Sequence, residues 1–129
     1  MRNEEFFIEE FTGADVNLLT RIVDTIAGEI SGNGRVAVHC RAGIGRTGMV
    51  LAAYFIKYHN YTAPDAIRHI RTLRRFSIET RQQVESLRAF ENYLRPPGGN
   101  GLPENTEKKS HSYSSRNFSI KDKILGCFL

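Results

Sequence analysis

The first half of the chain contains two segments whose apolar residues predict helices. In residues 16–30 an apolar residue returns every three or four positions, and a polar, glycine-containing stretch follows at 31–34. Asp15 stands directly before this stripe, where its carboxylate can cap the first helical turn. Residues 49–58 are apolar on nearly every side, which predicts a helix buried at the centre of the fold. Asn60 is placed to end that helix.

Two amphipathic helices are predicted in the second half of the chain. Thr62-Ala63-Pro64-Asp65 and Thr80-Arg81-Gln82-Gln83 both have the pattern of a capping box, and the first has proline in its first turn. Apolar residues at helical spacing follow each box. The positions expected to face the core are Ala66, Ile67, Ile70 and Leu73 in the first helix and Val84, Leu87, Phe90 and Leu94 in the second.

Two short apolar runs, at residues 5–8 and 35–39, are predicted to be strands. The second run lies between two predicted helices, and this alternation is typical of an α/β domain. We assign that domain to residues 1–95. A sheet of two strands is marginal in water unless helices cover it, so we expect low stability or aggregation if these runs are the whole sheet.

The composition changes after the last predicted helix. Prolines and glycines fill residues 96–101, and residues 102–129 are rich in Ser, Lys, Asn and Glu with little apolar pattern. We predict a disordered tail over residues 96–129. Cys127 is third from the end, whereas a prenylation box needs a cysteine fourth from the end. Prenylation is therefore not expected, and acylation of Cys127 beside Lys121 and Lys123 stays a hypothesis.

Charge and cysteine content indicate which partners the protein could bind and in which compartment it would be found. The chain has 129 residues and a formal net charge of +4, which fits anionic partners without choosing among phosphoproteins, phosphoinositides and nucleic acids. Two cysteines do not make a disulfide framework, and neither a signal peptide nor a long apolar span is visible. We therefore expect an intracellular protein of the cytoplasm, or of the nucleus, without stable membrane insertion.

A loop with two glycines joins the run at 35–39 to the central helix, and it can cradle a phosphate group. Gly43 and Gly45 let the backbone curl until several N–H groups point at one spot, and the helix that begins near Arg46 directs its positive end there. Cys40 lies beneath the same spot. Amide donors, a helix N-terminus and a guanidinium all favour its thiolate, so Cys40 is a candidate nucleophile.

Two residues after the glycines complete the predicted chemistry. Arg46 can form bidentate bonds to two phosphate oxygens, which a lysine could not do. The hydroxyl of Thr47, on the first helical turn, can donate to the sulfur and help it leave when a phosphocysteine is hydrolysed. We therefore predict Cys40, Arg46 and Thr47 as catalytic residues. The predicted substrate-binding residues are Arg41, Ala42, Gly43, Ile44, Gly45 and Arg46.

Residues 39–48 resemble the cysteine-dependent protein-tyrosine phosphatase superfamily, because they match its signature H-C-x-x-G-x-G-R-[ST]-G at every position. Later segments are similar to the small dual-specificity branch, so the resemblance extends over roughly residues 6–95. It implies a phosphatase-like parallel sheet flanked by helices and a phosphomonoester hydrolase that works through a phosphocysteine. Family members place several strands before the loop, so we expect the N-terminal strands to be missing from this chain. The later segments are Ala66-Ile67, Ile70-Arg71, Leu73-Arg74 and Ser77-Ile78-Glu79-Thr80.

The resemblance also implies a general acid on a loop before the cradle. Family members carry an aspartate there, in an apolar-Pro-Asp pattern, whereas this chain has Ile8-Glu9-Glu10. Glutamate can act as a general acid but reaches one methylene farther. We predict Glu10 as the acid, with Glu9 beside it, and the alternative is that both are solvated surface acids. Asp15 is a second candidate, although a helix cap explains it better.

The substrate is predicted from the resemblance and from the loop. Relatives in the dual-specificity branch imply phosphotyrosine and phosphoserine/threonine in proteins. Arg41 is similar to the basic residue that phosphoinositide phosphatases place after the cysteine, but those enzymes usually have another basic residue where this loop has Ile44. Phosphorylated proteins are therefore preferred over phosphoinositides, and we expect no cofactor, no metal and no nucleic-acid partner. The alternative function is a truncated, weak or inactive domain that binds phosphorylated partners.

Two further polar groups could lie near the loop. By resemblance, Glu79 and Gln83 match the place where some relatives position the hydrolytic water, although the helix cap also explains Gln83. The third predicted helix has a basic face that could guide a phosphorylated substrate, but a solvated face is the simpler interpretation, and its histidine is given no catalytic part. This face consists of Arg68, His69, Arg71, Arg74 and Arg75.

Overall fold

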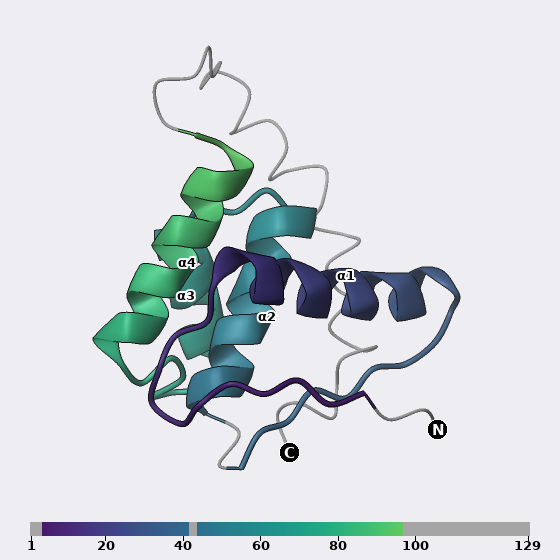
Figure 1. The fold of residues 1–129 in the computed structure, drawn as a ribbon, viewed down its shortest axis with the longest axis horizontal. Coiled ribbons are helices and arrows are strands. Elements are labelled where there is room, and N and C mark those ends of the chain that lie inside the picture. Colours follow the sequence, from purple (N-terminus) through teal and green to yellow (C-terminus); the bar gives the residue numbers. More distant parts are fainter. Residues whose placement is uncertain (1–3, 42–43, 97–129) are drawn as a thin grey trace.

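A computed structural model describes residues 4–41 and 44–96. In this part of the chain there are four helices, of which α2 lies at the centre (Figure 1). Helix α1 lies across α2, and α3 and α4 pack beside it. The helices are α1 (Val16–Ser31), α2 (Gly45–Tyr58), α3 (Ala63–Leu73) and α4 (Arg81–Leu94).

Helix α2 forms the core of the molecule. All of its residues from Thr47 to Ile56 are buried, which confirms the prediction of a central helix. The other three helices each bury one apolar face, because apolar residues at helical spacing fall on one side of a helix. At the end of α2, Asn60 takes a positive φ of 62° and turns the chain toward α3.

Side-chain caps begin the three outer helices. Asp15 Oδ1 accepts from Leu18 N at 2.7 Å, and Thr62 Oγ1 accepts from Asp65 N at 3.2 Å. Thr80 and Gln83 form a reciprocal capping box at the start of α4. These caps confirm the helix starts predicted from the sequence, and they explain Asp15 as a structural residue.

The described residues contain no β-strand, so the predicted parallel sheet is not confirmed. The runs at 5–8 and 35–39 are extended segments that touch the helices along one side only. Ile8 is buried and Val38 is half-buried against the core, whereas Phe7 is 86% exposed. Two such short segments do not make a stable sheet on their own. Their contribution is to bring Glu10 and Cys40 to the N-terminal end of α2.

Some sequence-based predictions lie outside the described residues. They concern Ala42 and Gly43 in the loop, the tail beyond residue 96, and Cys127. Within the described part, none of the helices has both the length and the apolar character needed to span a bilayer.

Candidate active site

The thiol of Cys40 meets the start of α2 through Thr47. The Thr47 hydroxyl donates to Cys40 Sγ over 3.1 Å, and Thr47 itself is only 3% exposed. This contact follows from the local fold, because the extended segment that ends at Cys40 passes beneath the first turn of α2. Cys40 is half-buried there, and the Thr47 hydroxyl helps to hold its sulfur in place.

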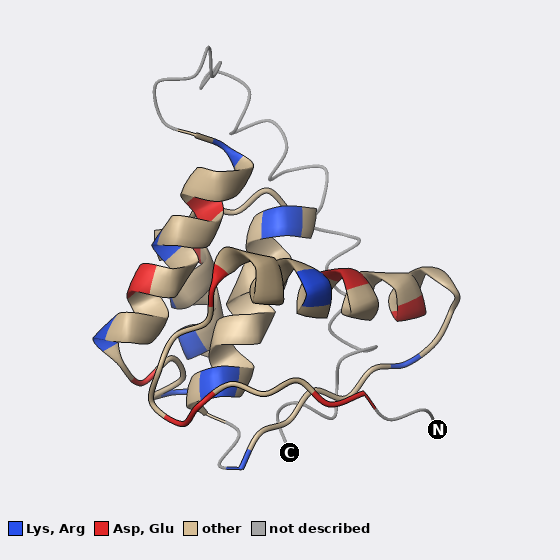
Figure 2. Ribbon diagram, in the orientation of Figure 1, with Lys and Arg blue, Asp and Glu red and all other residues tan. Residues whose placement is uncertain are grey.

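The N-terminus of α2 differs from those of the other helices, because no side chain caps it. Its N-cap residue is Ile44, which makes no side-chain hydrogen bond to the helix. The first N–H groups of a helix need an acceptor from outside the helix, and together they attract an anion. Figure 2 shows basic positions at the base of α2 and at the end of the extended segment that leads to it. The arrangement suits a phosphate group above Cys40.

Arg46 links this helix end to the N-terminal segment. One of its terminal nitrogens donates to the Ile8 carbonyl over 3.0 Å, and the other lies 3.4 Å from Glu10 Oε1. The guanidinium is half-buried and the Glu10 carboxylate is exposed at the surface. Glu10, the predicted acid, is therefore held beside the predicted phosphate-binding arginine.

Gln83 contributes a buried amide to the same place. Its Oε1 accepts from the backbone N–H of Glu79 at 2.8 Å and of Thr80 at 3.3 Å, which fixes the direction of the amide group. Gln83 is fully buried, and its Nε2 has no hydrogen-bond partner in the described part of the chain. A buried donor of this kind is costly unless a ligand or water accepts from it.

These groups line one small cavity of about 50 Å³. Its walls come from the N-terminal segment, the Cys40 segment, α2 and the start of α4, so residues far apart in the sequence converge there. Phe11 was not predicted as part of the site; its place directly after the two glutamates is the signal that could have found it. The lining residues are Glu10, Phe11, Cys40, Gly45, Arg46, Glu79 and Gln83.

Cys40 also lines a second, larger cavity of about 1100 Å³. It lies between α1 and the two extended segments, and Arg46, Thr47 and Val50 of α2 also line it. The described residues contain no group of three His, Cys, Asp or Glu side chains placed to hold a metal ion.

Comparisons with known proteins identify the family of this chain. Residues 8–93 match the family model of the dual specificity phosphatase catalytic domain. The chain belongs to the dual specificity phosphatase family. Of the curated relatives, a tyrosine-protein phosphatase CDC14 homolog of Schizosaccharomyces pombe is 36% identical over 74 residues, which are 57% of this chain and 14% of that protein.

Two further relatives extend the comparison. Protein tyrosine phosphatase domain-containing protein 1 of Mus musculus is 36% identical over 92 residues, 71% of this chain and 12% of that protein. A crystal structure of a mutant form of Tk-PTP has a TM-score of 0.66 and 30% identity, and the match covers 68% of this chain and 59% of that one. This structure supports an α/β phosphatase fold. The chain spans only a small part of its curated relatives.

Other predicted residues of this phosphatase domain are not gathered at the small cavity. Arg41 and Glu9 are exposed, and Arg41 lines the larger cavity. Ile44 is half-buried and accepts from Ile78 N at 3.2 Å, so it ties the Cys40 loop to the segment before α4.

The basic face predicted for α3 needs one correction, at His69, and one addition, at Arg71. His69 is half-buried, with its ring 4.8 Å from the centre of the Phe55 ring and 5.5 Å from that of Tyr61, because α3 turns this side toward the end of α2. Arg71 does not simply face solvent, since its guanidinium donates to the carbonyls of Ser77 at 3.0 Å and Ile78 at 2.9 Å. The solvated face is therefore wrong for His69, whereas Arg71 is exposed as predicted and also makes these two hydrogen bonds.

Proposed function

We propose that this domain hydrolyses phosphomonoesters of phosphotyrosine and phosphoserine/threonine in proteins through a phosphocysteine. The observation that carries the proposal is the hydrogen bond from the Thr47 hydroxyl to Cys40 Sγ, beside an uncapped helix N-terminus. A thiol in that position has a donor to stabilise its charge and an anion site directly above it. Residues 1–95 form the proposed catalytic domain.

In the first step the Cys40 thiolate attacks phosphorus. The sulfur–phosphorus bond forms while the bond to the leaving oxygen breaks, and that oxygen takes a proton from Glu10. Amide groups of the loop and Arg46 stabilise the charge on the other phosphate oxygens. Arg46 must exchange its bonds to Ile8 and Glu10 for bonds to phosphate. The released Glu10 carboxylate then takes up a proton from solvent, and this is the proton that it gives to the leaving oxygen.

In the second step water attacks the phosphocysteine. Glu10, now a carboxylate, accepts the proton of the water, and the sulfur leaves as a thiolate that Thr47 stabilises. The free donor of Gln83 supports a role in orienting this water, since it lines the cavity that Cys40 also lines. The products are inorganic phosphate and the restored thiolate.

Phosphorylated proteins are the proposed substrates, in preference to phosphoinositides. Family membership supports this choice, and so do the charges at the cavity. Glu10 and Glu79 are both exposed and line it, and two carboxylates at the mouth of the site would be repelled by a membrane rich in anionic lipid. We propose the cytoplasm or the nucleus as the setting.

The test is hydrolysis of p-nitrophenyl phosphate by the purified chain, with Cys40→Ser alongside. Its leaving group needs almost no acid, so formation of the phosphocysteine in this assay does not depend on Glu10 as a proton donor. We expect turnover that Cys40→Ser abolishes and vanadate inhibits, and phosphate trapped on Cys40 after rapid quenching. Equal turnover by the variant would disprove the mechanism.

A second candidate is a binding module that holds phosphorylated partners without turnover. One observation favours it: both terminal nitrogens of Arg46 are already engaged by Ile8 and Glu10, so phosphate must compete with the chain itself. Binding of a phosphopeptide by the wild-type chain, with no release of phosphate over hours, would support this module over the hydrolase.

A further inference from the structure

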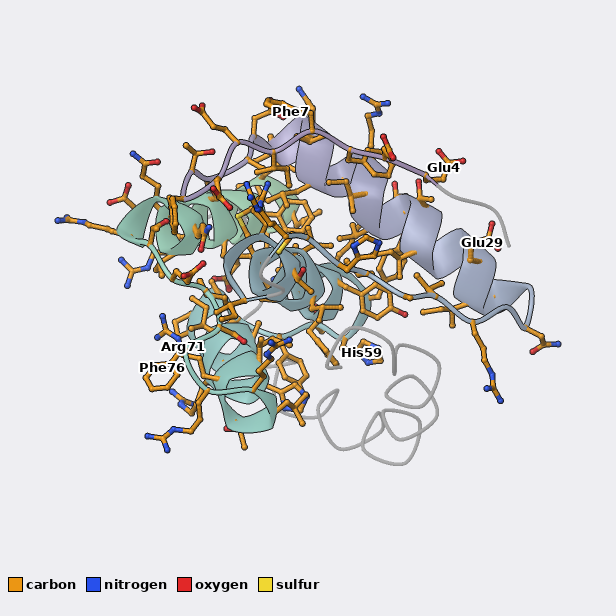
Figure 3. All side chains as sticks on the ribbon, turned by 90° about the horizontal axis from the view of Figure 1, so that it is seen from below. Glu4, Phe7, Glu29, His59, Arg71 and Phe76 are labelled. Carbon is orange, nitrogen blue, oxygen red and sulfur yellow. The ribbon has the colours of Figure 1, made fainter. Side chains whose placement is uncertain are left out.

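The loop that joins α3 to α4 exposes a phenylalanine in a strained conformation. Phe76 has φ of 66° and is 76% exposed, and Ile78 in the same loop has φ of 63°. Positive φ favours glycine or asparagine, and a bulky residue adopts it only where the surroundings impose it. Figure 3 shows the Phe76 side chain pointing away from the body of the molecule. Neither helix packing nor a turn requires an aromatic ring there.

The structure beneath this ring is firmly held. Arg71 donates to the carbonyls of both Ser77 and Ile78, and these two residues are 2% and 1% exposed. The backbone at Phe76 is therefore held in place by its buried neighbours, and the exposed ring projects from it. A contact residue that is already ordered loses little conformational freedom when a partner binds.

This loop adjoins the candidate active site. Ile78 N donates to the carbonyl of Ile44, the N-cap residue of α2, over 3.2 Å. Glu79, the next residue, lines the small cavity with Cys40. The loop that carries Phe76 is thus joined within three residues to the wall of the cavity.

The charge around the ring is positive. The Arg75 guanidinium lies over the Phe76 ring, 5.3 Å from its centre. Arg74 and Arg75 form no ion pair with a carboxylate in the described part of the chain. An exposed aromatic ring beside arginines is the composition of an interface hot spot, and these charges fit an acidic partner.

We propose that residues 74–78, the docking loop, bind the part of a phosphorylated protein substrate that flanks its phosphorylated residue. An apolar side chain of the substrate packs on Phe76, and acidic side chains pair with Arg74 and Arg75. This inference rests on the proposed hydrolase function. It favours a protein over an anionic membrane because the chain belongs to the dual specificity phosphatase family.

The test compares two phosphopeptides that differ only in the residues flanking the phosphorylated one. One peptide has acidic flanking residues with a leucine, and the other has basic flanking residues. The substrate without flanking residues is p-nitrophenyl phosphate. We expect kcat/KM to be about tenfold higher for the acidic peptide than for the basic peptide. Phe76→Gly, which suits the positive φ, should lower the ratio of acidic-peptide to p-nitrophenyl phosphate kcat/KM about tenfold, mainly through KM. Arg75→Gln should lower it by a smaller factor. Tyr93→Ala removes an aromatic ring on α4 that is 56% exposed and is the matched control, which should leave the ratio unchanged.

Each other outcome has a definite meaning. An unchanged ratio in Phe76→Gly, with p-nitrophenyl phosphate still hydrolysed, would overturn the docking loop and leave the hydrolase intact. Binding to phosphatidylserine vesicles that depends on Phe76, without any change in the peptide ratio, would assign the loop to a membrane and overturn the proposal. No turnover of any substrate would overturn the hydrolase and this inference together.

Discussion

The guanidinium of Arg46 lies 3.4 Å from the carboxylate of Glu10, a residue 36 positions earlier in the chain. Both side chains are partly exposed, at 22% and 45%, so their pairing contributes little to stability and phosphate can replace the carboxylate. The pair thus keeps the proposed acid next to the proposed phosphate-binding group before a substrate arrives.

Replacing Glu10 by glutamine should separate acid catalysis from the rest of the mechanism. We expect kcat for a phosphothreonine peptide to fall about 100-fold, because the alkoxide then leaves without a proton. The initial burst of p-nitrophenol from p-nitrophenyl phosphate, which reports the first step alone, should change little, since its leaving group is stable as an anion. Steady-state kinetics on the peptide and stopped-flow kinetics on p-nitrophenyl phosphate measure this difference.

Glu9→Gln is the control for that experiment, because Glu9 is also exposed but does not line the cavity. It should leave both activities near the wild-type values. Equal losses in the two variants would mean that Glu10 is one of two solvated acids and not the proton donor.

The Thr47 hydroxyl should matter most in the second step. Thr47→Val keeps the shape of this buried residue but removes the donor to Cys40 Sγ, so the sulfur becomes a poorer leaving group. We expect kcat about 10–100-fold lower, as for the loss of a hydrogen bond to a charged group. A burst of p-nitrophenol in stopped flow would show that phosphocysteine accumulates. Thr47→Ser keeps the hydroxyl and should restore most of the rate; a steady-state trace without a burst in Thr47→Val would contradict the role.

Gly48 is predicted to be the glycine on which the position of the docking loop depends. A Cβ at Gly48 would lie 3.0 Å from Ser77 Cβ and 3.1 Å from the backbone nitrogen of Ile78. Arg71 holds these two residues in place through their carbonyls. Gly48→Ala should lower the free energy of unfolding by about 1–3 kcal/mol, as overpacking does. Urea denaturation measures the change.

Gly28→Ala on α1 is the matched comparison. A Cβ there meets nothing within 4 Å, and the position is exposed in a helix interior. This variant should raise the free energy of unfolding by about 0.5–1 kcal/mol. Destabilisation of the same size in both variants would show that contact with Ser77 and Ile78 is not the cause.

Stability should fall in acid because of His59. This residue is 3% exposed, and burial, with a smaller effect of His69, lowers its pKa from 6.5 to about 4. Between these two values the unfolded chain binds a proton at this position that the folded chain does not, so the free energy of unfolding decreases as the pH falls. The decrease attributable to His59 should be on the order of 2–3 kcal/mol.

His59→Phe provides the control, because it keeps an aromatic ring against Tyr54 and Phe55 and cannot titrate. Urea denaturation at several pH values between neutral and about 4 should give a flatter profile for this variant. Parallel profiles for the two proteins would rule out His59 as the cause of the acid sensitivity.

The sequence by itself determined the helices and their starts. Asp15, Thr62 and Thr80 cap helices through bonds to residues three positions away, and the buried residues of α2 form one continuous run. These features depend on interactions within one turn, which the order of residues specifies directly. The contact of the Thr47 hydroxyl with Cys40 Sγ was also predicted from the sequence, because only a short loop separates the two residues.

Only the tertiary structure decided which distant residues meet. Four contacts join different elements of the fold. They are the pair of Glu10 and Arg46, the Gln83 amide in the cavity, the bonds of Arg71 to the docking loop, and the packing of His69 against Phe55. No local pattern specifies these contacts, because they depend on how the helices pack around α2. The extended segments depend on tertiary structure in the same way. An apolar run predicts a strand, but a strand forms only where another segment supplies its hydrogen-bond partners.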